Sequence, residues 1–214
     1  YLCIVTMLDS QAARTIVSNN MDADIEIKND TAMKEHKKDR KDILDESIVT
    51  SIKDLDGVLE VHPVVFAEIT VPWEPDFSDM WMKEFYEKWL TVPYSQEKEE
   101  YQNHPENFGS SLIGIDEQKF DFLNENLEQP INKEEFLSGK TCIIYRNGLD
   151  LSNSDLIGSK VTCALHSDKQ VTQTFTIEGV TDESYYTAIL GYPPTIITSD
   201  QVVKNFANES ITLR

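Results

Sequence analysis

The chain has 214 residues, with 38 Asp and Glu against 19 Lys and Arg, which gives a formal net charge of −19. Hydrophobic residues make up 40% of it, enough for a packed core in one large domain or two small ones. Nucleic acid and anionic membrane surfaces would repel so acidic a protein, because both bind through Lys and Arg. A cationic partner would be attracted. The acidity also keeps an exposed domain soluble, and that interpretation needs no partner.

Residues 1–20 begin with the apolar segment Tyr1–Leu8 and continue as a predicted helix over 9–20. The given residues show no pattern of a secretory signal peptide, and none of their runs reaches the ~18–20 apolar residues that span a bilayer. We interpret residues 1–20 as the end of a membrane helix and the stalk helix that follows it. A buried first strand or helix is the alternative.

Residues 21–72 are predicted to form a β-α-β unit. The segment Asp24–Lys28 alternates polar and apolar residues, as a strand does. Ile48, Ile52 and Leu55 lie on one face of a helix near residues 45–55, and Gly57 suits the left-handed position that ends a helix. A run rich in β-branched residues then extends to about Val71.

Residues 73–109 form an acidic and aromatic insertion. Trp81, Phe85 and Trp89 follow each other at the i, i+4, i+8 spacing of one helical face. Two interpretations of this stripe remain open. It is either the buried face of a helix or an exposed patch, ringed by carboxylates, that binds a partner such as a cationic amphipathic peptide. These three residues are the candidate ligand-binding or partner-binding site, and we expect at least one of the tryptophans to be buried.

From residue 110 the chain becomes rich in predicted strands, and residues 110–192 are expected to form a β-rich subdomain, mostly antiparallel over 141–180. Asp116 and Asn132 are predicted N-caps of short helices, and Asn147-Gly148 predicts a tight turn because both residues tolerate positive φ. Residues 193–214 are expected to hold an extended segment, a helix capped by Ser199 and the start of another strand from Ser210. The strands are predicted over Ser110–Ile115, Thr141–Tyr145, Lys160–His166, Gln170–Val180 and Thr195–Thr198.

The sequence offers no motif for catalysis, metal binding or a cofactor. The four histidines lack metal-ligand spacing, and no phosphate-binding loop or nucleophile elbow is present. The three cysteines, Cys3, Cys142 and Cys163, are an odd number, which cannot form a full disulfide framework, and their spacing fits no zinc motif. We expect them to be free thiols. We therefore expect no catalytic residue, no metal and no cofactor.

The order of several segments resembles the extracellular domain of FtsX/MacB-like ABC transporter permeases, the MacB-like periplasmic core. The resemblance covers nearly the whole chain, except for residues 73–109 and a second β-α-β unit that is missing beyond Ser210. It is carried by Asp56-Gly57-Val58, Gly114-Ile115-Asp116, Phe136–Lys140, Gly158-Ser159-Lys160, Phe175–Val180 and Thr195–Val203.

This resemblance implies an α+β fold, with a ferredoxin-like β-α-β part next to the membrane and a β-rich subdomain inserted into it. It also implies a non-catalytic domain on the extracellular side of a bacterial cell membrane, which couples cytoplasmic ATP hydrolysis to export or other work outside. Its partners would be the rest of the permease, usually a dimer, and the ATP-binding subunit. The alternatives are a stand-alone extracellular binding protein or lipoprotein, and a surface hydrolase, which would need a cleft of converging polar side chains.

Overall fold

Helix α3 (Glu46–Lys53) is the one regular element described in the first of the two compact units into which the chain divides, residues 1–61 and 62–214. The structure is a computed structural model that describes residues 46–58, 61, 64–75, 77–90, 93–166, 168–182 and 194–212. Helix α3 confirms the helix predicted near residues 45–55, and Gly57 after it has a φ of 89°. The stalk predicted over residues 1–20 and the strand predicted over Asp24–Lys28 lie outside the described residues.

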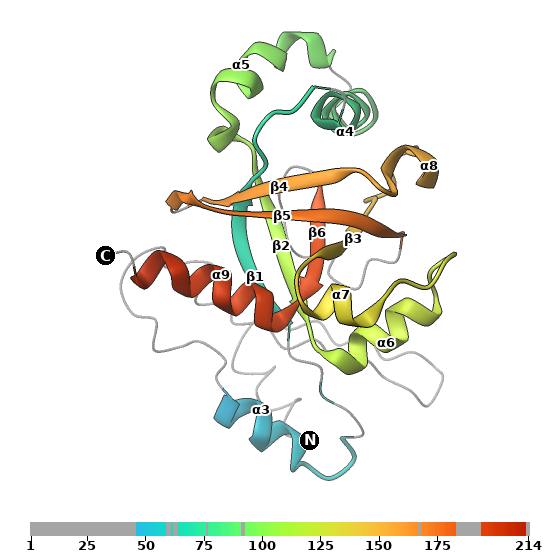
Figure 1. The fold of residues 1–214 in the computed structure, drawn as a ribbon, viewed down its shortest axis with the longest axis vertical. Helices are drawn as coiled ribbons and strands as arrows, with labels where there is room; N and C mark the ends of the chain where they lie inside the picture. Colours follow the sequence, from blue (N-terminus) through green and yellow to red (C-terminus); the bar gives the residue numbers. More distant parts are fainter. Residues whose placement is uncertain are drawn as a thin grey trace. The chain divides into compact units, whose positions relative to one another are not determined.

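The second unit is built on a barrel (Figure 1). Its strands are β1 (Val64–Thr70), β2 (Gly109–Ile115), β3 (Thr141–Tyr145), β4 (Lys160–Leu165), β5 (Asp168–Thr181) and β6 (Thr195–Ser199). Its helices are α4 (Phe77–Phe85), η2 (Tyr86–Leu90), η3 (Tyr94–Gln96), α5 (Lys98–Asn103), η4 (Pro105–Asn107), α6 (Glu117–Glu125), α7 (Lys133–Leu137), α8 (Asn153–Leu156) and α9 (Asp200–Thr212).

The strands close on themselves in the order β1-β2-β6-β3-β5-β4. Strand β1 pairs antiparallel with both β2 and β4, and the pairs β4–β5 and β3–β6 are also antiparallel. The pairs β2–β6 and β3–β5 are parallel. Each of these strands therefore has two neighbours, so closure removes the unpaired edges that an open sheet would expose.

Three adjacent strands of the barrel are buried on both faces, because helices cover them outside. Along β2 the side chain of Leu112 points into the barrel core, whereas Ile113 belongs to a second core under α6 and α7. Strands β3 and β6 repeat this alternation, which explains their continuous apolar runs. Phe120 of α6 and Phe136 of α7 stack at a centroid distance of 4.3 Å and complete the outer layer.

Helices α9 and α4 pack against the barrel interior from its two ends (Figure 1). From α9, Val203 and Phe206 join the core, and a Cβ added at Gly114 of β2 would lie 2.7 Å from the Cα of Asp200. The backbones of β2 and α9 thus touch at a position that only glycine allows. From α4, Phe77 and Trp81 enter the same core.

The segment 71–108 is inserted into the β1–β2 hairpin, because Thr70 and Gly109 are still paired across the ladder. It has its own hydrophobic cluster, which consists of Met82, Tyr86, Tyr94, Tyr101 and Phe108. The Tyr101 hydroxyl donates a hydrogen bond of 3.0 Å to the carbonyl of Val71. The insertion is therefore a small helical layer with one side on the barrel mouth.

The expected ferredoxin-like α+β fold is wrong, because the described strands of the second unit close into one mixed barrel. The expectation assumed that strands near each other in sequence pair as β-α-β units. Instead β1 pairs with the distant strand β4, and β2 with β6. The antiparallel expectation for residues 141–180 holds for β4–β5 and fails for β3–β5. The strand expected from Ser210 is also wrong, since α9 continues to Thr212.

Candidate functional site

The three residues of the aromatic stripe, predicted as a binding site, differ in how far the structure buries them. Trp81 is fully buried in the barrel core, and Phe85 is half-buried. Trp89 keeps 55% of its surface exposed, and Leu90 beside it keeps 43%. Any contact of this stripe with a ligand would therefore have to come through its C-terminal end.

A change of helix type explains the separation. The stripe assumes a regular α-helix from Trp81 to Trp89, but α4 ends at Phe85 and η2 continues as a π-helix. A π-helix bonds residue i to i+5 and so has more residues per turn. Side chains beyond Phe85 therefore rotate away from the face that Trp81 buries. Such π-segments occur frequently at functional sites.

The end of η2 rests on the loop after β3, and the two together form a surface that we call the Trp89 face. Lys88 Nζ lies 2.8 Å from Asp150 Oδ2, and Glu84 Oε1 accepts a hydrogen bond of 3.2 Å from the Asp150 backbone. A Cβ added at Gly148 would lie 3.4 Å from Cζ2 of Trp89. The Trp89 face consists of Glu84, Lys88, Trp89, Leu90, Gly148 and Asp150.

The loop beneath Trp89 is held in shape by a turn and an arginine. Asn147 and Gly148 have φ of 52° and 69°, which confirms the predicted tight turn. Its hydrogen bond runs from the Leu149 N–H to the Arg146 carbonyl at 3.0 Å. Arg146 also donates to Asp182 Oδ1 and to the Leu151 carbonyl, each at 2.8 Å. The exposed Trp89 ring therefore lies against a well-braced support.

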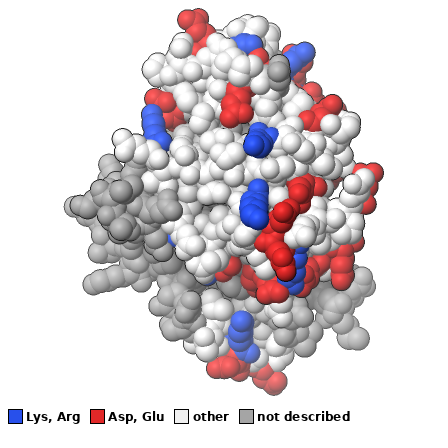
Figure 2. Space-filling view, in the orientation of Figure 1, with Lys and Arg blue, Asp and Glu red and all other residues white. Residues whose placement is uncertain are grey.

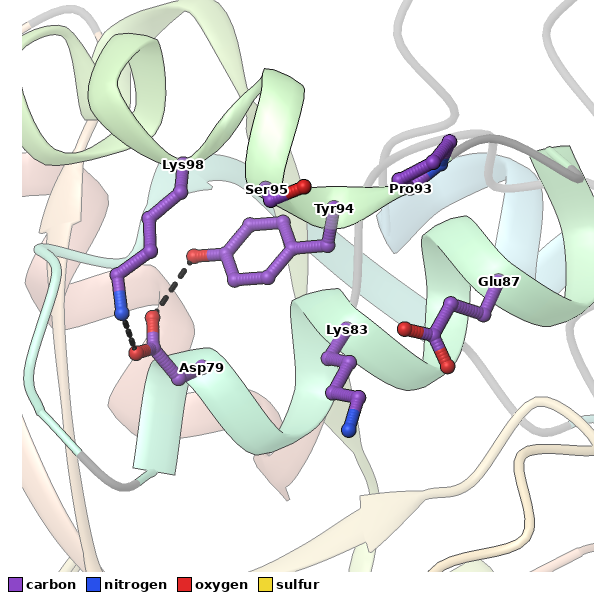
Figure 3. Close-up of a pocket in the computed structure, with 7 residues that line it drawn as sticks. All are labelled: Asp79, Lys83, Glu87, Pro93, Tyr94, Ser95 and Lys98. Atoms are coloured by element: carbon purple, nitrogen blue, oxygen red, sulfur yellow. Dashed lines mark hydrogen bonds and ion pairs between the residues drawn. The ribbon is translucent and has the colours of Figure 1, made fainter.

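A pocket of about 240 Å³ lies in the insertion, where α4, η2, η3 and α5 contribute to its lining (Figure 3). Asp79 is one of its lining residues, and its Oδ1 accepts hydrogen bonds from Trp73 Nε1 at 2.8 Å and Tyr94 Oη at 2.9 Å. Lys98 pairs with the other oxygen. The pocket is lined by Asp79, Lys83, Glu87, Pro93, Tyr94, Ser95 and Lys98.

These contacts decide the protonation of the pocket. Burial opposes ionisation of Asp79, but the hydrogen bonds from Lys98, Trp73 and Tyr94 outweigh it and lower the pKa of the carboxyl. Burial and then the neighbouring Asp79 carboxylate raise the pKa of the Tyr94 hydroxyl, which stays protonated. Because three donors engage Asp79, its role here is to hold the insertion together. The charges left at the rim are Lys83 and Glu87, whose side chains Figure 3 shows apart from this network.

The described residues contain no group of three His, Cys, Asp or Glu side chains placed to hold a metal ion. His104 Nδ1 lies 3.6 Å from Glu106 Oε1, and His166 directly follows strand β4. Cys142 and Cys163 are buried free thiols, and burial raises the pKa of Cys163 to about 12. In the same described ranges, none of the helices combines the length and the apolar character needed to traverse a bilayer.

Sequence reasoning did not place Asp150 at the Trp89 face, and it counted Asp79 only among the carboxylates around the aromatic stripe. Nothing local marks Asp150 as a partner of Lys88, since the two meet only through the tertiary fold. Asp79 carried a weak signal, because Trp73 and Tyr94 flank it with buried hydrogen-bond donors that need an acceptor.

Acidic side chains recur over the face drawn in Figure 2, with basic side chains among them. The segment 73–109 alone has nine Asp and Glu residues and three Lys.

Comparison with known proteins found no matching family model, no similar curated protein and no similar solved structure.

Proposed function

We propose that this protein is a recognition domain that binds a cationic amphipathic peptide segment at the Trp89 face. The observation that carries the proposal is an exposed tryptophan on a braced support, on the same surface as Asp150. The carboxylate of Asp150 pairs with Lys88, and 81% of that side chain is exposed. An exposed aromatic anchor beside charged groups is typical of an interaction site, and tryptophan is enriched among residues that dominate binding energy.

Each part of the surface has its own task in this proposal. The surplus of carboxylates attracts a cationic segment and accelerates its encounter. The Trp89 and Leu90 side chains then cover the apolar side of the peptide, and a Lys or Arg can lie over the indole ring. The closed barrel supplies the rigid scaffold on which such a site depends.

The setting inferred from resemblance, an extracellular permease domain that works with an ATP-binding subunit, stays a separate proposal. It drew on a ferredoxin-like layout that is wrong for the described strands. The recognition function is therefore proposed from the surface alone, and it is compatible with either a transporter domain or a stand-alone binding protein.

Titration calorimetry with a synthetic peptide of Lys and Leu, patterned as an amphipathic helix, tests the proposal. The Trp89→Ala and Asp150→Asn variants should each weaken binding, Trp89→Ala at least about tenfold, or about 1.4 kcal/mol. A peptide with Glu in place of Lys should not bind.

Matched controls separate a site from general attraction between opposite charges. Phe122 is 48% exposed on α6, and Asp121 pairs with Lys133 at 2.7 Å as Asp150 pairs with Lys88. Phe122→Ala and Asp121→Asn should leave the affinity unchanged. If these variants weaken binding as much as the Trp89-face variants do, the peptide is held by net charge and the proposal fails.

A further inference from the structure

Asn147 is the one asparagine in the sequence that is followed by glycine. Glycine has no Cβ to shield its backbone nitrogen, so other groups can approach that nitrogen closely. Gly148 is exposed and Asn147 half-buried at the tip of the turn. None of the hydrogen bonds among the described residues uses the Gly148 N–H or the amide group of the Asn147 side chain. Neither the Gly148 nitrogen nor the side-chain amide of Asn147 is therefore held by a hydrogen bond within the described residues.

We propose that Asn147 is a site of spontaneous deamidation and that packing of Trp89 against the turn sets its rate. The Gly148 backbone nitrogen attacks Cγ of Asn147 and loses its proton, and the bond between Cγ and Nδ2 of Asn147 breaks to release ammonia. A five-membered succinimide remains. Water then opens this ring at one of its two carbonyls, which gives an aspartyl or an isoaspartyl residue. The net change is one amide and one water converted to one carboxylic acid and one ammonia, with no change of oxidation state.

The structure also contains the restraint on this reaction. Ring closure needs the Asn147–Gly148 peptide to rotate out of its turn conformation. The hydrogen bond between Leu149 and Arg146 opposes that rotation, as does the buried side chain of Leu149. Trp89 covers one side of Gly148. Removal of the indole should therefore accelerate the reaction.

The product changes the same surface in two ways. A new carboxylate appears on the turn, one residue before Gly148 of the Trp89 face, and makes this surface more acidic. The isoaspartyl form adds a methylene to the backbone and cannot keep the same tight turn. The fraction of molecules with an altered loop would thus increase with the age of the protein. This inference does not depend on peptide binding, because its readout is mass.

The test is incubation of the folded full chain at mildly alkaline pH, followed by mass spectrometry of the proteolytic peptide that carries both Asn147 and Asn153. Asn153 precedes Ser154, and its side-chain amide donates to Glu128, so it is an internal control. The mass gain of deamidation should accumulate first at Asn147. It should be lost at that position in Asn147→Gln, whose longer side chain would need a larger ring.

Trp89→Ala should speed the gain at Asn147, while Phe122→Ala should not. A gain at Asn153 that is as fast as the gain at Asn147 would overturn the assignment. An unchanged or slower rate in Trp89→Ala, with the fold intact by circular dichroism, would overturn the control by Trp89.

Discussion

Tyr94 donates a hydrogen bond of 2.9 Å to the carboxylate of Asp79, which joins η3 to the start of α4. Trp73 donates to the same oxygen from the segment after β1, and Lys98 of α5 holds the other oxygen. One carboxylate therefore ties together four segments of the insertion, from Trp73 to Lys98. This arrangement braces the insertion, whose own hydrophobic cluster includes Tyr94.

Asp79→Ala should destabilise the fold by about 1.5–3 kcal/mol, the usual contribution of hydrogen bonds to a charged group. Tyr94→Phe removes a single donor and should cost about 1 kcal/mol. Urea unfolding monitored by circular dichroism measures both. Lys83→Ala, at the rim of the same pocket, is the control and should be neutral. An Asp79→Ala variant as stable as the parent would show that the three donors find other acceptors.

The lowered pKa of Asp79 also predicts an acid limb of stability. Its folded pKa lies below the ordinary value of 3.8, so the stabilisation is present above that value and disappears as the pH falls through the folded pKa. Melting temperatures of the parent and of Asp79→Asn should therefore converge as the pH is lowered from 5 towards 2. Curves that stay parallel would mean that Asp79 does not contribute to acid sensitivity.

Trp81 carries a buried indole N–H for which no acceptor is found among the described residues. Trp81→Ala should destabilise the protein by about 3–5 kcal/mol, because it opens a cavity in the core at the barrel mouth. Trp81→Phe also loses volume, but it removes an unpaired donor whose burial costs about 1–3 kcal/mol. We therefore expect Trp81→Phe to be nearly neutral in chemical denaturation. If Trp81→Phe is as costly as Trp81→Ala, the N–H is satisfied.

Stability should also decline at alkaline pH. Burial raises the pKa of the Tyr101 hydroxyl from 10.0 to about 12, and that of the Cys163 thiol from 9.0 to about 12. Between these values the unfolded protein releases protons that the folded protein retains, so rising pH favours unfolding. Urea midpoints should fall from about pH 9 upwards, and the fall should be shallower in Cys163→Ala. A slope that this variant leaves unchanged would assign the decline to other groups.

Two glycines of β2 provide a paired test of barrel packing. A Cβ at Gly114 would meet the Asp200 backbone at 2.7 Å, whereas a Cβ at Gly109 would meet the flexible end of Glu68 at 3.3 Å. Gly114→Ala should cost about 1–3 kcal/mol by overpacking against α9. Gly109→Ala should cost much less, because the Glu68 side chain is free to move. Equal losses in thermal melts would contradict the close approach of β2 and α9.

Local signals in the sequence predicted many of the elements. Asp116 and Asn132 are N-caps, and their side chains accept from Lys119 at 2.7 Å and from Glu135 at 3.0 Å. The prediction of β3 over Thr141–Tyr145 matches the strand, and the Asn147-Gly148 turn is present. Capping and turn chemistry depend on a few neighbouring residues, so one sequence is enough to reveal them.

Partnerships between strands could not be predicted in the same way. The apolar runs Ile143-Ile144 and Ile196-Ile197 indicate strands buried on both faces, but they do not say which strand lies alongside which. The candidate site was predicted only in part, because it too depends on structure that residue spacing does not reveal. Residue spacing placed Trp81 and Trp89 on one face. Trp89 lies in a π-helix that no local pattern indicated, and this change of helix type turns it to the surface.

The pairing of Thr70 with Gly109 has a consequence for how this protein can change. The insertion leaves and re-enters the barrel at adjacent points, so its length adds little strain to the scaffold, and loop closure grows more costly only slowly with length. Segments of different size and specificity could be exchanged at this hairpin while β1 and β2 keep their register. The replacement would have to supply apolar side chains in place of Phe77 and Trp81, because these fill the open end of the barrel. An exchanged segment would therefore fit this barrel only if its own apolar side chains closed the same end.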